Sequence, residues 1–369
     1  MILKSLSLTG FKNIRHVSLE FSPKINCFLG DNGMGKSNLL DALYFLSFCR
    51  SFTGAQDALL VRRGDDFASL RGEYFRRGLD EEITAGLRRG SRKTFKRGGK
   101  AYQRLAEHIG AFPLVLLSPS DMELAGGEPA ERRRFIDQII SQSDGRYLDT
   151  LIRYNAALEQ RNRLLRDENG DDSIFDALEI QLEMAGEYIT DRREKAIRRL
   201  SEIFGPYYRA ISDGAEEAAL EYVHTAYPQG LAAHLASMRT RDRALHYTAS
   251  GPHRDDILFT SDGMPVRRTA SQGQTKTFTT ALRFAQYELL RESLGIRPLL
   301  LLDDIFDKLD AGRVSRIMAI VGASDTFGQI FITDTNRRHL DEIIADIPCD
   351  ADNYRLWHVD RGSFSPVIV

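Results

Sequence analysis

The chain has 369 residues, of which 42% are hydrophobic and 28% are charged, and its formal net charge is −2. These values are ordinary for a globular protein, and the length favours one large domain that carries an insertion. No apolar run approaches the roughly eighteen residues of a membrane span. The first residues alternate like a strand and lack the apolar centre of a signal peptide. Three scattered cysteines, Cys27, Cys49 and Cys349, are too few for a disulfide framework or a zinc site, so we expect a cytoplasmic protein.

The first motif follows a group of two or three strands predicted within residues 2–30. "GDNGMGKS", residues 30–37, fits the P-loop pattern G-x-x-x-x-G-K-[ST], and a helix predicted over residues 37–47 follows it directly. In such a loop, backbone N–H groups surround a β-phosphate, Lys36 reaches the β- and γ-phosphate oxygens, and the Ser37 hydroxyl binds Mg²⁺. The predicted nucleotide-binding residues are Gly30, Asp31, Asn32, Gly33, Met34, Gly35, Lys36, Ser37 and Asn38.

A basic run without acidic residues spans residues 88–104, "RRGSRKTFKRGGKAYQR". Its charge and two interleaved aromatic residues, Phe95 and Tyr102, favour a surface that contacts DNA phosphates without reading bases. A solvated β-hairpin that turns at residues 98–99 explains the same pattern, and the two interpretations are compatible. The candidate DNA-binding residues are Arg88, Arg89, Arg92, Lys93, Lys96, Arg97 and Lys100, with Arg132, Arg133 and Arg134 as further candidates.

The middle of the chain is predicted to be helical. The segment "FPLVLLSPSDMELAGG" predicts a buried strand, after which Ser118, Pro119 and Asp121 match a helix start with a capping box. Two stripes of mostly apolar residues recur at three- and four-residue steps, and the turn-like "DENGDDS" separates them. They predict an antiparallel helical hairpin with a coiled-coil seam. At about 1.5 Å per residue the second helix would be roughly 40–45 Å long. The stripes consist of Leu148, Leu151, Asn155, Leu158, Asn162 and Leu165, and of Phe175, Leu178, Leu182, Ala185, Ile189, Ala196 and Leu200.

Strand-like patterns return near residues 245–268, and α/β alternation continues to the end of the chain. "PLLLLDDIFDKLD", residues 298–310, predicts a strand that is buried on both faces, as in the middle of a parallel sheet. At its end, Asp303 is expected to hold through water the Mg²⁺ that the Ser37 hydroxyl binds. Asp304 stands where a general base would orient or deprotonate the attacking water, so the catalytic candidates are Asp304 and Lys36.

A second polar motif, "TASQGQTKT" at residues 269–277, lies in front of a helix predicted over residues 275–294. Burial of the apolar face of that helix would leave its N-terminus accessible, and an anion could bind there beside Ser271 and the flexible Gly273. A plain helix cap is the simpler interpretation of the same residues.

The order of these motifs resembles the ABC-type ATPase heads of the SMC, Rad50 and RecF group. Within this group the chain is most similar to the RecF family, over nearly its whole length. The resemblance is carried by the N-terminal block that ends in "SNLLDALYFLSFCRSF", and by "SPSDMELAGGEPAERRRFID", "YNAALEQRNRLL", "SGPHRDDILF" and "TASQGQTKT". It implies an α/β fold, an ABC-type P-loop ATPase head with an inserted α-helical arm built as a short antiparallel coiled coil. The head is expected at residues 1–118 and 244–369, and the arm at residues 119–243.

The resemblance also implies what the protein does. The cofactors would be ATP and Mg²⁺, and slow, DNA-stimulated hydrolysis would reset a homodimer that forms on ATP. The signature residues Ser271, Gln272, Gly273 and Gln274 would contact the γ-phosphate held by the other subunit, and Asp310 would act across the interface as the D-loop residue. Implied partners are DNA at single-strand gaps and the proteins RecR and RecO, which help to place a recombinase. The implied location is cytoplasmic and nucleoid-associated, without a membrane.

Some positions and alternatives stay open. The strand motif "QIFITDT" ends at Thr333, Asp334 and Thr335 with no histidine where relatives often have a switch histidine, and no glutamine marks a Q-loop near residues 118–121. His253 and Arg254 would touch nucleotide or fix the head–arm joint. A transporter energy module would need a hydrophobic docking helix, and a Rad50-type nuclease partner would need a Cys-x-x-Cys hook, which "DENGDD" lacks. An SMC-like ATPase with another DNA-processing partner is a further alternative. The function that the resemblance implies is a clamp on DNA that closes when ATP brings two heads together. An ATP-binding DNA scaffold without turnover differs from this clamp only in the chemistry of Asp304.

Overall fold

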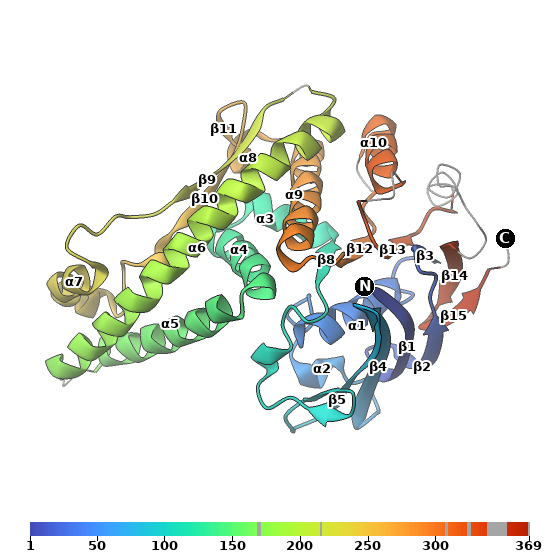
Figure 1. Cartoon of the computed structure of the whole chain (residues 1–369), viewed down its shortest axis with the longest axis horizontal. Coiled ribbons are helices and arrows are strands. Elements are labelled where there is room, and N and C mark those ends of the chain that lie inside the picture. The colour runs from blue at the N-terminus through green and yellow to red at the C-terminus, as the bar shows by residue number, and fades with distance from the viewer. Residues whose placement is uncertain (168–170, 215, 307–308, 323–325, 338–352, 368–369) are drawn as a thin grey trace.

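The computed structural model describes residues 1–369 except 168–170, 215, 307–308, 323–325, 338–352 and 368–369. A head built around two large sheets lies to the right in Figure 1, and long helices extend from it to the left as an arm. The α/β head with an inserted helical arm that the resemblance implied is therefore the observed fold.

Three sheets organise the strands. An antiparallel sheet runs in the order β2 (Ile14–Glu20), β1 (Ile2–Phe11), β4 (Phe67–Arg76), β5 (Leu79–Arg88), β6 (Thr94–Arg97) and β7 (Lys100–Ala101). A second sheet runs in the order β15 (Ser363–Pro366), β14 (Tyr354–Asp360), β3 (Ile25–Leu29), β13 (Ile330–Asp334), β12 (Leu299–Asp303) and β8 (Leu114–Leu117). Its strands are parallel except for β15, which makes it the nucleotide-binding type of sheet. The third sheet has the order β11 (Met264–Pro265), β10 (Asp256–Ser261) and β9 (Ala218–Val223).

The helices fall into a head group and an arm group. Those of the head and its junction with the arm are α1 (Lys36–Phe48), α2 (Asp57–Leu60), α3 (Met122–Gly126), α4 (Pro129–Ser143), α8 (Val266–Thr269), α9 (Gln272–Leu294) and α10 (Ala311–Gly322). The arm contains α5 (Gly145–Leu164), α6 (Asp172–Ser212) and α7 (Leu231–Leu245). Short 3₁₀ turns cover Leu105–Glu107, Pro119–Asp121 and Pro252–Arg254. In the second of these turns the Asp121 carboxylate accepts from the Ser118 N–H at 2.9 Å, as the capping pattern predicted.

The parallel sheet separates two hydrophobic clusters. Leu299 and Leu301 of β12 point into the cluster shared with α1 and the antiparallel sheet, whereas Leu300 and Leu302 point into the cluster shared with α4, α6 and α9. All four side chains are at most 1% exposed. Alternate residues of a strand face opposite sides of its sheet, so a run of four leucines is what a strand buried on both faces requires.

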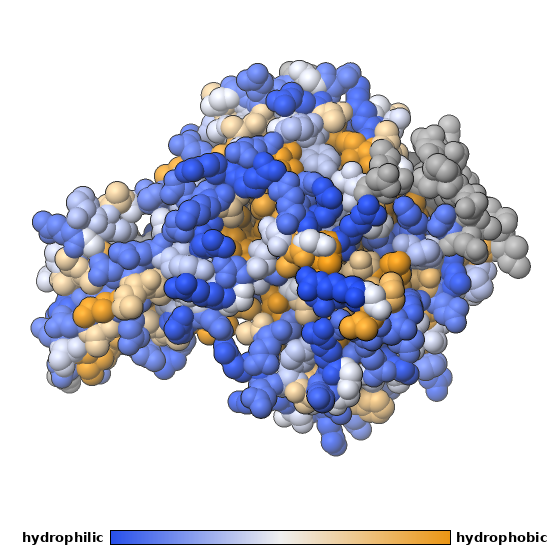
Figure 2. All heavy atoms as spheres, in the orientation of Figure 1, coloured by the Kyte–Doolittle hydropathy of each residue, from blue (hydrophilic) through white to orange (hydrophobic). Residues whose placement is uncertain are grey.

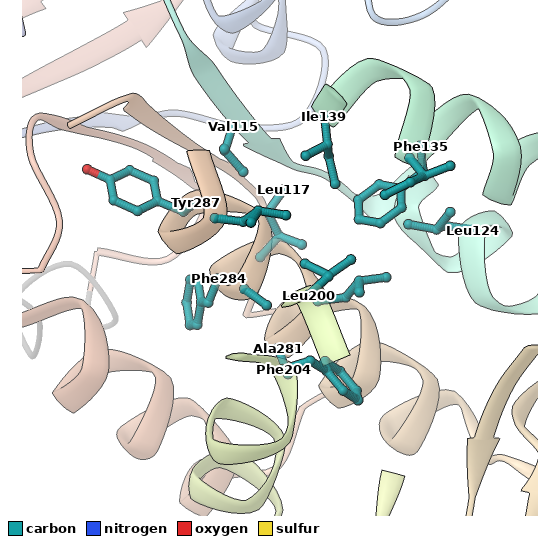
Figure 3. Close-up of a cluster of buried hydrophobic side chains, with 14 of the residues drawn as sticks. Val115, Leu117, Leu124, Phe135, Ile139, Leu200, Phe204, Ala281, Phe284 and Tyr287 are labelled. Carbon is teal, nitrogen blue, oxygen red and sulfur yellow. The ribbon is translucent and has the colours of Figure 1, made fainter. Parts of the chain in front are cut away.

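The longest helix, α6, connects the arm to the head. Near its C-terminal end, Leu200 and Phe204 lie against Ala281 and Phe284 of α9, as Figure 3 shows. The ring of Phe204 also lies 4.7 Å from that of Phe278, centroid to centroid. This packing makes the root of the arm continuous with the core of the head.

The structure corrects the predicted seam of the first arm helix. On α5 the buried face consists of Tyr147, Thr150, Tyr154, Ala157 and Arg161, and it continues to Leu165 just beyond the helix. This face lies one position before most of the predicted stripe, so Leu148, Leu151 and Leu158 are only partly buried and Asn155 is exposed. The prediction followed the leucines, but two tyrosines and an arginine occupy the seam because their polar ends find partners. Tyr147 donates to Asp137 of α4, Tyr154 contacts His253, and Arg161 donates to Glu179.

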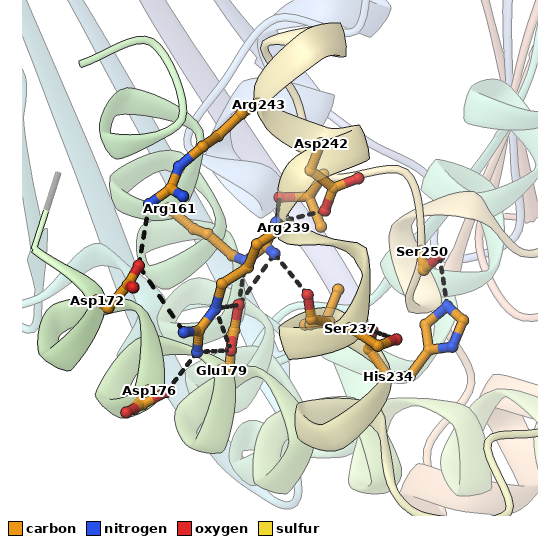
Figure 4. Close-up of polar contacts among 12 residues, drawn as sticks. Arg161, Asp172, Asp176, Glu179, His234, Ser237, Arg239, Asp242, Arg243 and Ser250 are labelled. Atoms are coloured by element: carbon orange, nitrogen blue, oxygen red, sulfur yellow. Dashed lines mark hydrogen bonds and ion pairs between the residues drawn. The ribbon is translucent and has the colours of Figure 1, made fainter. Parts of the chain in front are cut away.

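A buried ion network joins the three arm helices (Figure 4). Arg161 of α5 is fully buried and donates to Glu179 of α6 at 3.0 Å and to Asp242 of α7 at 2.7 Å. Arg239 of α7 contacts the same Glu179 carboxylate. Buried charges are tolerated where they are paired and hydrogen-bonded, so this network fixes the register of the three helices.

The surface is mostly hydrophilic on the face shown in Figure 2, where apolar side chains gather only in small patches. Within the described residues, no helix combines the length and the hydropathy that crossing a membrane requires.

Candidate functional site

The carboxyl ends of three neighbouring parallel strands meet at one edge of the second sheet. Leu29 of β3 pairs with Asp334 of β13, and Thr333 of β13 pairs with Asp303 of β12. The P-loop, Asp334 and Asp303 therefore start from the same edge, where open α/β sheets bind their ligands. The sequence predicted this central place for residues 299–303, and the strand order confirms it.

Glycine is required at two positions of the loop between β3 and α1. A Cβ on Gly30 would lie 2.3 Å from the carbonyl oxygen of Val359 in β14. At Gly35, which caps α1 with φ 112°, a Cβ would lie 2.7 Å from the side-chain nitrogen of Asn13. The loop is thus wedged between β14 and the β1–β2 turn, and it delivers the N-terminal N–H groups of α1 to the sheet edge.

Lys36 and Ser37 are held by short contacts at the start of α1. The Lys36 ammonium group, on a residue only 3% exposed, donates to the carbonyl oxygens of Gly30 at 2.6 Å and Asp31 at 3.1 Å. The Ser37 hydroxyl donates to Asp303 Oδ1 at 2.9 Å. A hydroxyl and a carboxylate meeting in this way are hard oxygen donors, and they fit Mg²⁺, which takes few protein ligands and keeps several waters.

Asp303 is 4% exposed and sits among groups that influence its charge. Burial raises the pKa of its carboxyl group, while hydrogen bonds from Thr333 and Ser37 and the charge of Lys36 oppose that rise. Thr333 Oγ1 donates to the same Oδ1 at 2.7 Å. A divalent cation at this carboxylate would add a further charge that favours its ionised form.

Asp304 follows in a left-handed conformation with φ 46°. Its N–H donates to the carbonyl oxygen of Thr333 at 3.2 Å, which fixes this conformation at the end of the strand. Asp304 lines a cavity of about 460 Å³ together with Asn32 of the P-loop, Lys276 of α9 and Asp334. Backbone strain of this kind, on the order of 1–3 kcal/mol, is found at functional sites. Asp304 thus lines the cavity beside the P-loop.

The signature turn forms a capping box at the start of α9. Ser271 Oγ accepts from the Gln274 N–H at 3.2 Å, and Gln274 Oε1 accepts from the Ser271 N–H at 2.8 Å. Ser271 and Gln272 are exposed, and Ser271 does not line the cavity that contains Asn32 and Asp304. The turn is therefore a helix cap, whatever else it binds, and it leaves an exposed helix N-terminus outside the chain's own P-loop cavity.

Asp310 lies beside this turn through Arg313 of α10. The Asp310 carboxylate accepts from the Arg313 N–H at 2.9 Å and pairs with its guanidinium at 3.3 Å. A Cβ on Gly273 would lie 2.9 Å from Arg313 Nη1, so the Arg313 side chain of α10 lies directly against this glycine. The predicted D-loop residue and the signature motif thus share one surface.

His253 belongs to the joint between arm and head. Its Nδ1 accepts from the Tyr154 hydroxyl at 2.7 Å, and its Nε2 donates to the carbonyl oxygen of Thr248 at 2.9 Å, in the tautomer that these contacts require. Burial lowers its pKa to about 4. A neutral histidine with both nitrogens engaged ties α5 to the turn at Pro252–Arg254, which is the second of the two roles considered for it.

The basic run forms the predicted hairpin, and only some of its basic side chains could contact DNA phosphates. Strands β6 and β7 pair Arg97 with Lys100 across the turn at residues 98–99. Arg89 donates to the carbonyl oxygen of Val61, Lys93 pairs with Asp57, and Arg97 pairs with Glu81. No hydrogen bond or ion pair within the described residues engages the exposed side chains of Arg88, Arg92, Lys96 and Lys100. These four remain candidates for phosphate contact.

The aromatic part of that prediction is wrong for Phe95. Phe95 is 2% exposed and lies 5.4 Å from the ring of Phe45, so it anchors the hairpin in the core. Of the junction arginines, Arg132 is buried and binds Asp256 through two hydrogen bonds of 2.8 and 3.0 Å, which makes it a structural residue.

Two residues of the site escaped the sequence analysis. Thr333 bridges Asp303 and the backbone of Asp304, and Asn13 contacts Met34 and Asn38 from the opposite side of the loop. A threonine directly before Asp334 in a buried strand was a weak signal for the first. Nothing near Asn13 in the sequence indicated the second, because its role depends on the fold of the β1–β2 turn.

Fold and site together define an ABC-type P-loop ATPase head. Comparison with known proteins supports this class: residues 2–347 match the family model described as RecF/RecN/SMC N terminal domain. An SMC head domain from Pyrococcus furiosus, with 18% identity, a TM-score of 0.59 and coverage of 99% and 96% of the two chains, shares the fold.

Relatives of higher sequence identity show which family within this class the chain belongs to. The DNA replication and repair protein RecF of Parabacteroides distasonis is 48% identical over 367 residues, which cover 100% of both chains. A solved structure of the recombination mediator protein RecF with ATP, from the RecFOR pathway, has a TM-score of 0.87 and 29% identity, with 99% of each chain covered. The chain belongs to the RecF family of DNA replication and repair proteins.

Proposed function

We propose that this protein is an ATP-driven DNA clamp that acts at single-strand gaps and helps recombination mediators to load a recombinase. The observation that carries the proposal is the separation of two half-sites. The P-loop, Asp303 and Asp304 meet at one sheet edge, whereas the exposed signature turn at Ser271 does not line the same cavity. A second copy of the chain, related by two-fold symmetry, would bring each signature turn to the other copy's P-loop.

The nucleotide would be ATP, by similarity to the relative solved with ATP. The N–H groups at the start of α1 and the Lys36 ammonium group would hold its phosphates, and Ser37 with Asp303 would hold Mg²⁺, which neutralises phosphate charge. The Asp304 carboxylate would orient the attacking water, and Thr333 fixes its backbone. On the other face, Ser271, Gly273 and the dipole of α9 would stabilise the γ-phosphate of the facing subunit.

ATP would act here as a population switch. Binding of its γ-phosphate by both subunits favours the closed dimer, and hydrolysis removes that contact and reopens the dimer.

DNA would be held through phosphates, with Arg88, Arg92, Lys96 and Lys100 as contacts. RecR and RecO are the proposed protein partners, and a cytoplasmic, nucleoid-associated location follows from the proposed action on DNA. The proposed division is a head of residues 1–118 and 244–369 and an arm of residues 119–243.

A DNA scaffold that binds ATP without turnover is the competing function, and the rate of ATP hydrolysis separates the two. The clamp requires slow hydrolysis that falls by about 10²–10⁴-fold in Asp304→Asn while ATP affinity is retained. Hydrolysis in the wild type that is no faster than in Asp304→Asn, with DNA present, would favour the scaffold.

A further inference from the structure

A second cavity, of about 500 Å³, lies where the arm joins the head. Its walls come from the end of α1, from α4, α5 and α6, and from the turn at Pro252–Arg254. No residue of the P-loop, of the Asp303–Asp304 pair or of the signature turn lines it. Its volume lies within the range of pockets that hold small organic ligands, about 300–1,000 Å³.

The charge on these walls is predominantly positive. Four arginines line the cavity, Arg50, Arg133, Arg134 and Arg193, against one carboxylate, Asp137. Arg193 and Asp137 neutralise each other through two hydrogen bonds of 2.8 and 2.9 Å. Three guanidinium groups remain, from the end of α1 and from the second turn of α4.

Within the described residues, no ion pair joins any of these three to a buried acid. Arg133 Nη1 donates to the backbone carbonyl of Asp255 at 2.6 Å, and that acceptor carries no net charge. Burial and the nearby Arg193 lower the pKa of Arg133, and this effect is only partly opposed by Asp256, Asp137 and Asp255. Arg134 pairs with Glu131 in an exposed contact, which contributes little. An anion in the cavity would relieve the repulsion between Arg133 and Arg193.

The part of the lining that α5 contributes includes two leucines. Leu148, Leu151 and Asn155 line the cavity, and they are members of the stripe that the sequence analysis assigned to the arm seam. These three residues therefore belong to the head–arm cavity. Guanidinium groups together with leucines and one amide match a ligand that has a phosphate at one end and a flat, partly apolar ring at the other.

We propose that this cavity binds one unpaired nucleotide of single-stranded DNA, with its phosphate on Arg50, Arg133 and Arg134 and its base against Leu148 and Leu151. The inference rests on the proposed function and extends it, because it gives the protein a contact that distinguishes a single strand from a duplex. A base in a duplex is stacked and paired, so it does not enter a cavity without unpairing. Asn155 offers both a donor and an acceptor to the edge of an unpaired base.

The test measures binding of the full-length chain to fluorescein-labelled (dT)20 and to a 20-base-pair duplex by anisotropy, with ATP and Mg²⁺, at several salt concentrations. We expect Arg50→Glu with Arg134→Glu to weaken single-strand binding by about tenfold or more and to lower its salt slope by about 0.7 for each phosphate that is no longer neutralised. Leu151→Trp fills the cavity without changing its charge, and it should weaken single-strand binding while duplex affinity is kept.

Arg163→Glu with Arg198→Glu is the matched control, because it reverses two arginine charges at side chains that are 69% and 70% exposed and outside the cavity. Single-strand affinity within twofold of wild type in both cavity variants would overturn the inference. An equal loss of single-strand affinity in the control would also overturn it. A third contrary result would be a glutamate-rich peptide that displaces labelled (dT)20 at a lower concentration than unlabelled (dT)20 does. A wild-type chain that binds no DNA refutes the proposed function as well, whereas DNA binding that the cavity variants leave unchanged refutes the cavity alone.

Discussion

The Ser37 hydroxyl donates to the Asp303 carboxylate at 2.9 Å, although 266 positions of sequence separate the two residues. Ser37 opens α1 after β3 and the P-loop, Asp303 ends β12, and between these two strands lies β13, whose Thr333 donates to the same carboxylate oxygen. Two strand ends and the start of α1 thus converge on one oxygen, and the sheet and α1 together set the position proposed for Mg²⁺.

This convergence predicts the effect of removing the Asp303 charge. Asp303→Asn keeps the size of the side chain but removes its negative charge. We expect the Mg²⁺-dependent part of ATP affinity to fall by about 10- to 100-fold, as for other groups that hold a metal through water. Isothermal titration with and without Mg²⁺ measures this difference. Asp80→Asn, at a side chain that is 71% exposed, is the control and should not change it.

The arm network predicts a large loss of stability. Arg161→Met leaves the buried Asp242 without a cation and Glu179 with Arg239 alone, so the free energy of unfolding should fall by about 3–5 kcal/mol. Urea unfolding followed by circular dichroism measures it. Arg163→Met removes an exposed arginine from the same helix and should cost less than about 0.5 kcal/mol. Equal stability of the two variants would show that the network contributes nothing.

His108 predicts how stability depends on pH. It is fully buried, its Nε2 donates to the carbonyl oxygen of Leu46 at 2.6 Å, and burial lowers its pKa to about 4. The unfolded chain takes up this proton near pH 6.5, so the stabilisation is complete above pH 6.5 and is lost progressively as the pH falls towards 4. His108→Gln removes the titration. Between pH 7 and pH 5, the free energy of unfolding of wild type should therefore fall by about 2 kcal/mol more than that of the variant. This figure uses about 1.4 kcal/mol for each pH unit between the two pKa values. Parallel pH profiles would contradict the assignment.

The exposed lysines of the hairpin predict a contribution to DNA affinity that does not depend on the DNA sequence. Lys96→Ala with Lys100→Ala should weaken binding equally across DNA sequences and lower the duplex salt slope by about 0.9 for each phosphate that the two lysines neutralise. Fluorescence anisotropy over a range of salt concentrations measures both quantities. Lys195→Ala with Arg198→Ala removes two exposed charges from α6 and is the control. An unchanged slope in the hairpin variant would make this surface a solvated hairpin only.

Much of the head could be predicted because its motifs are local. The P-loop needs glycines and a lysine at fixed spacing, and the buried strand before Asp303 needs four consecutive leucines, so both are visible in the sequence. Thr333 and Asn13 were not visible because their roles depend on strand order and on a turn far away in the sequence. The α5 seam was misassigned because Tyr154 and Arg161 become core residues only when His253, Glu179 and Asp242 are placed opposite them.

The central claim is that Ser271 faces the γ-phosphate of a second copy of the chain. Light scattering on Asp304→Asn measures its molar mass with Mg²⁺ and either ADP or ATP. Asparagine tolerates the left-handed conformation at this position, so the variant should fold and retain ATP. The account predicts a monomer with ADP, a dimer with ATP, and a monomer with ATP when Ser271→Arg is added. A monomer under every condition, with ATP nevertheless bound, would reduce the signature turn to a helix cap and contradict the clamp.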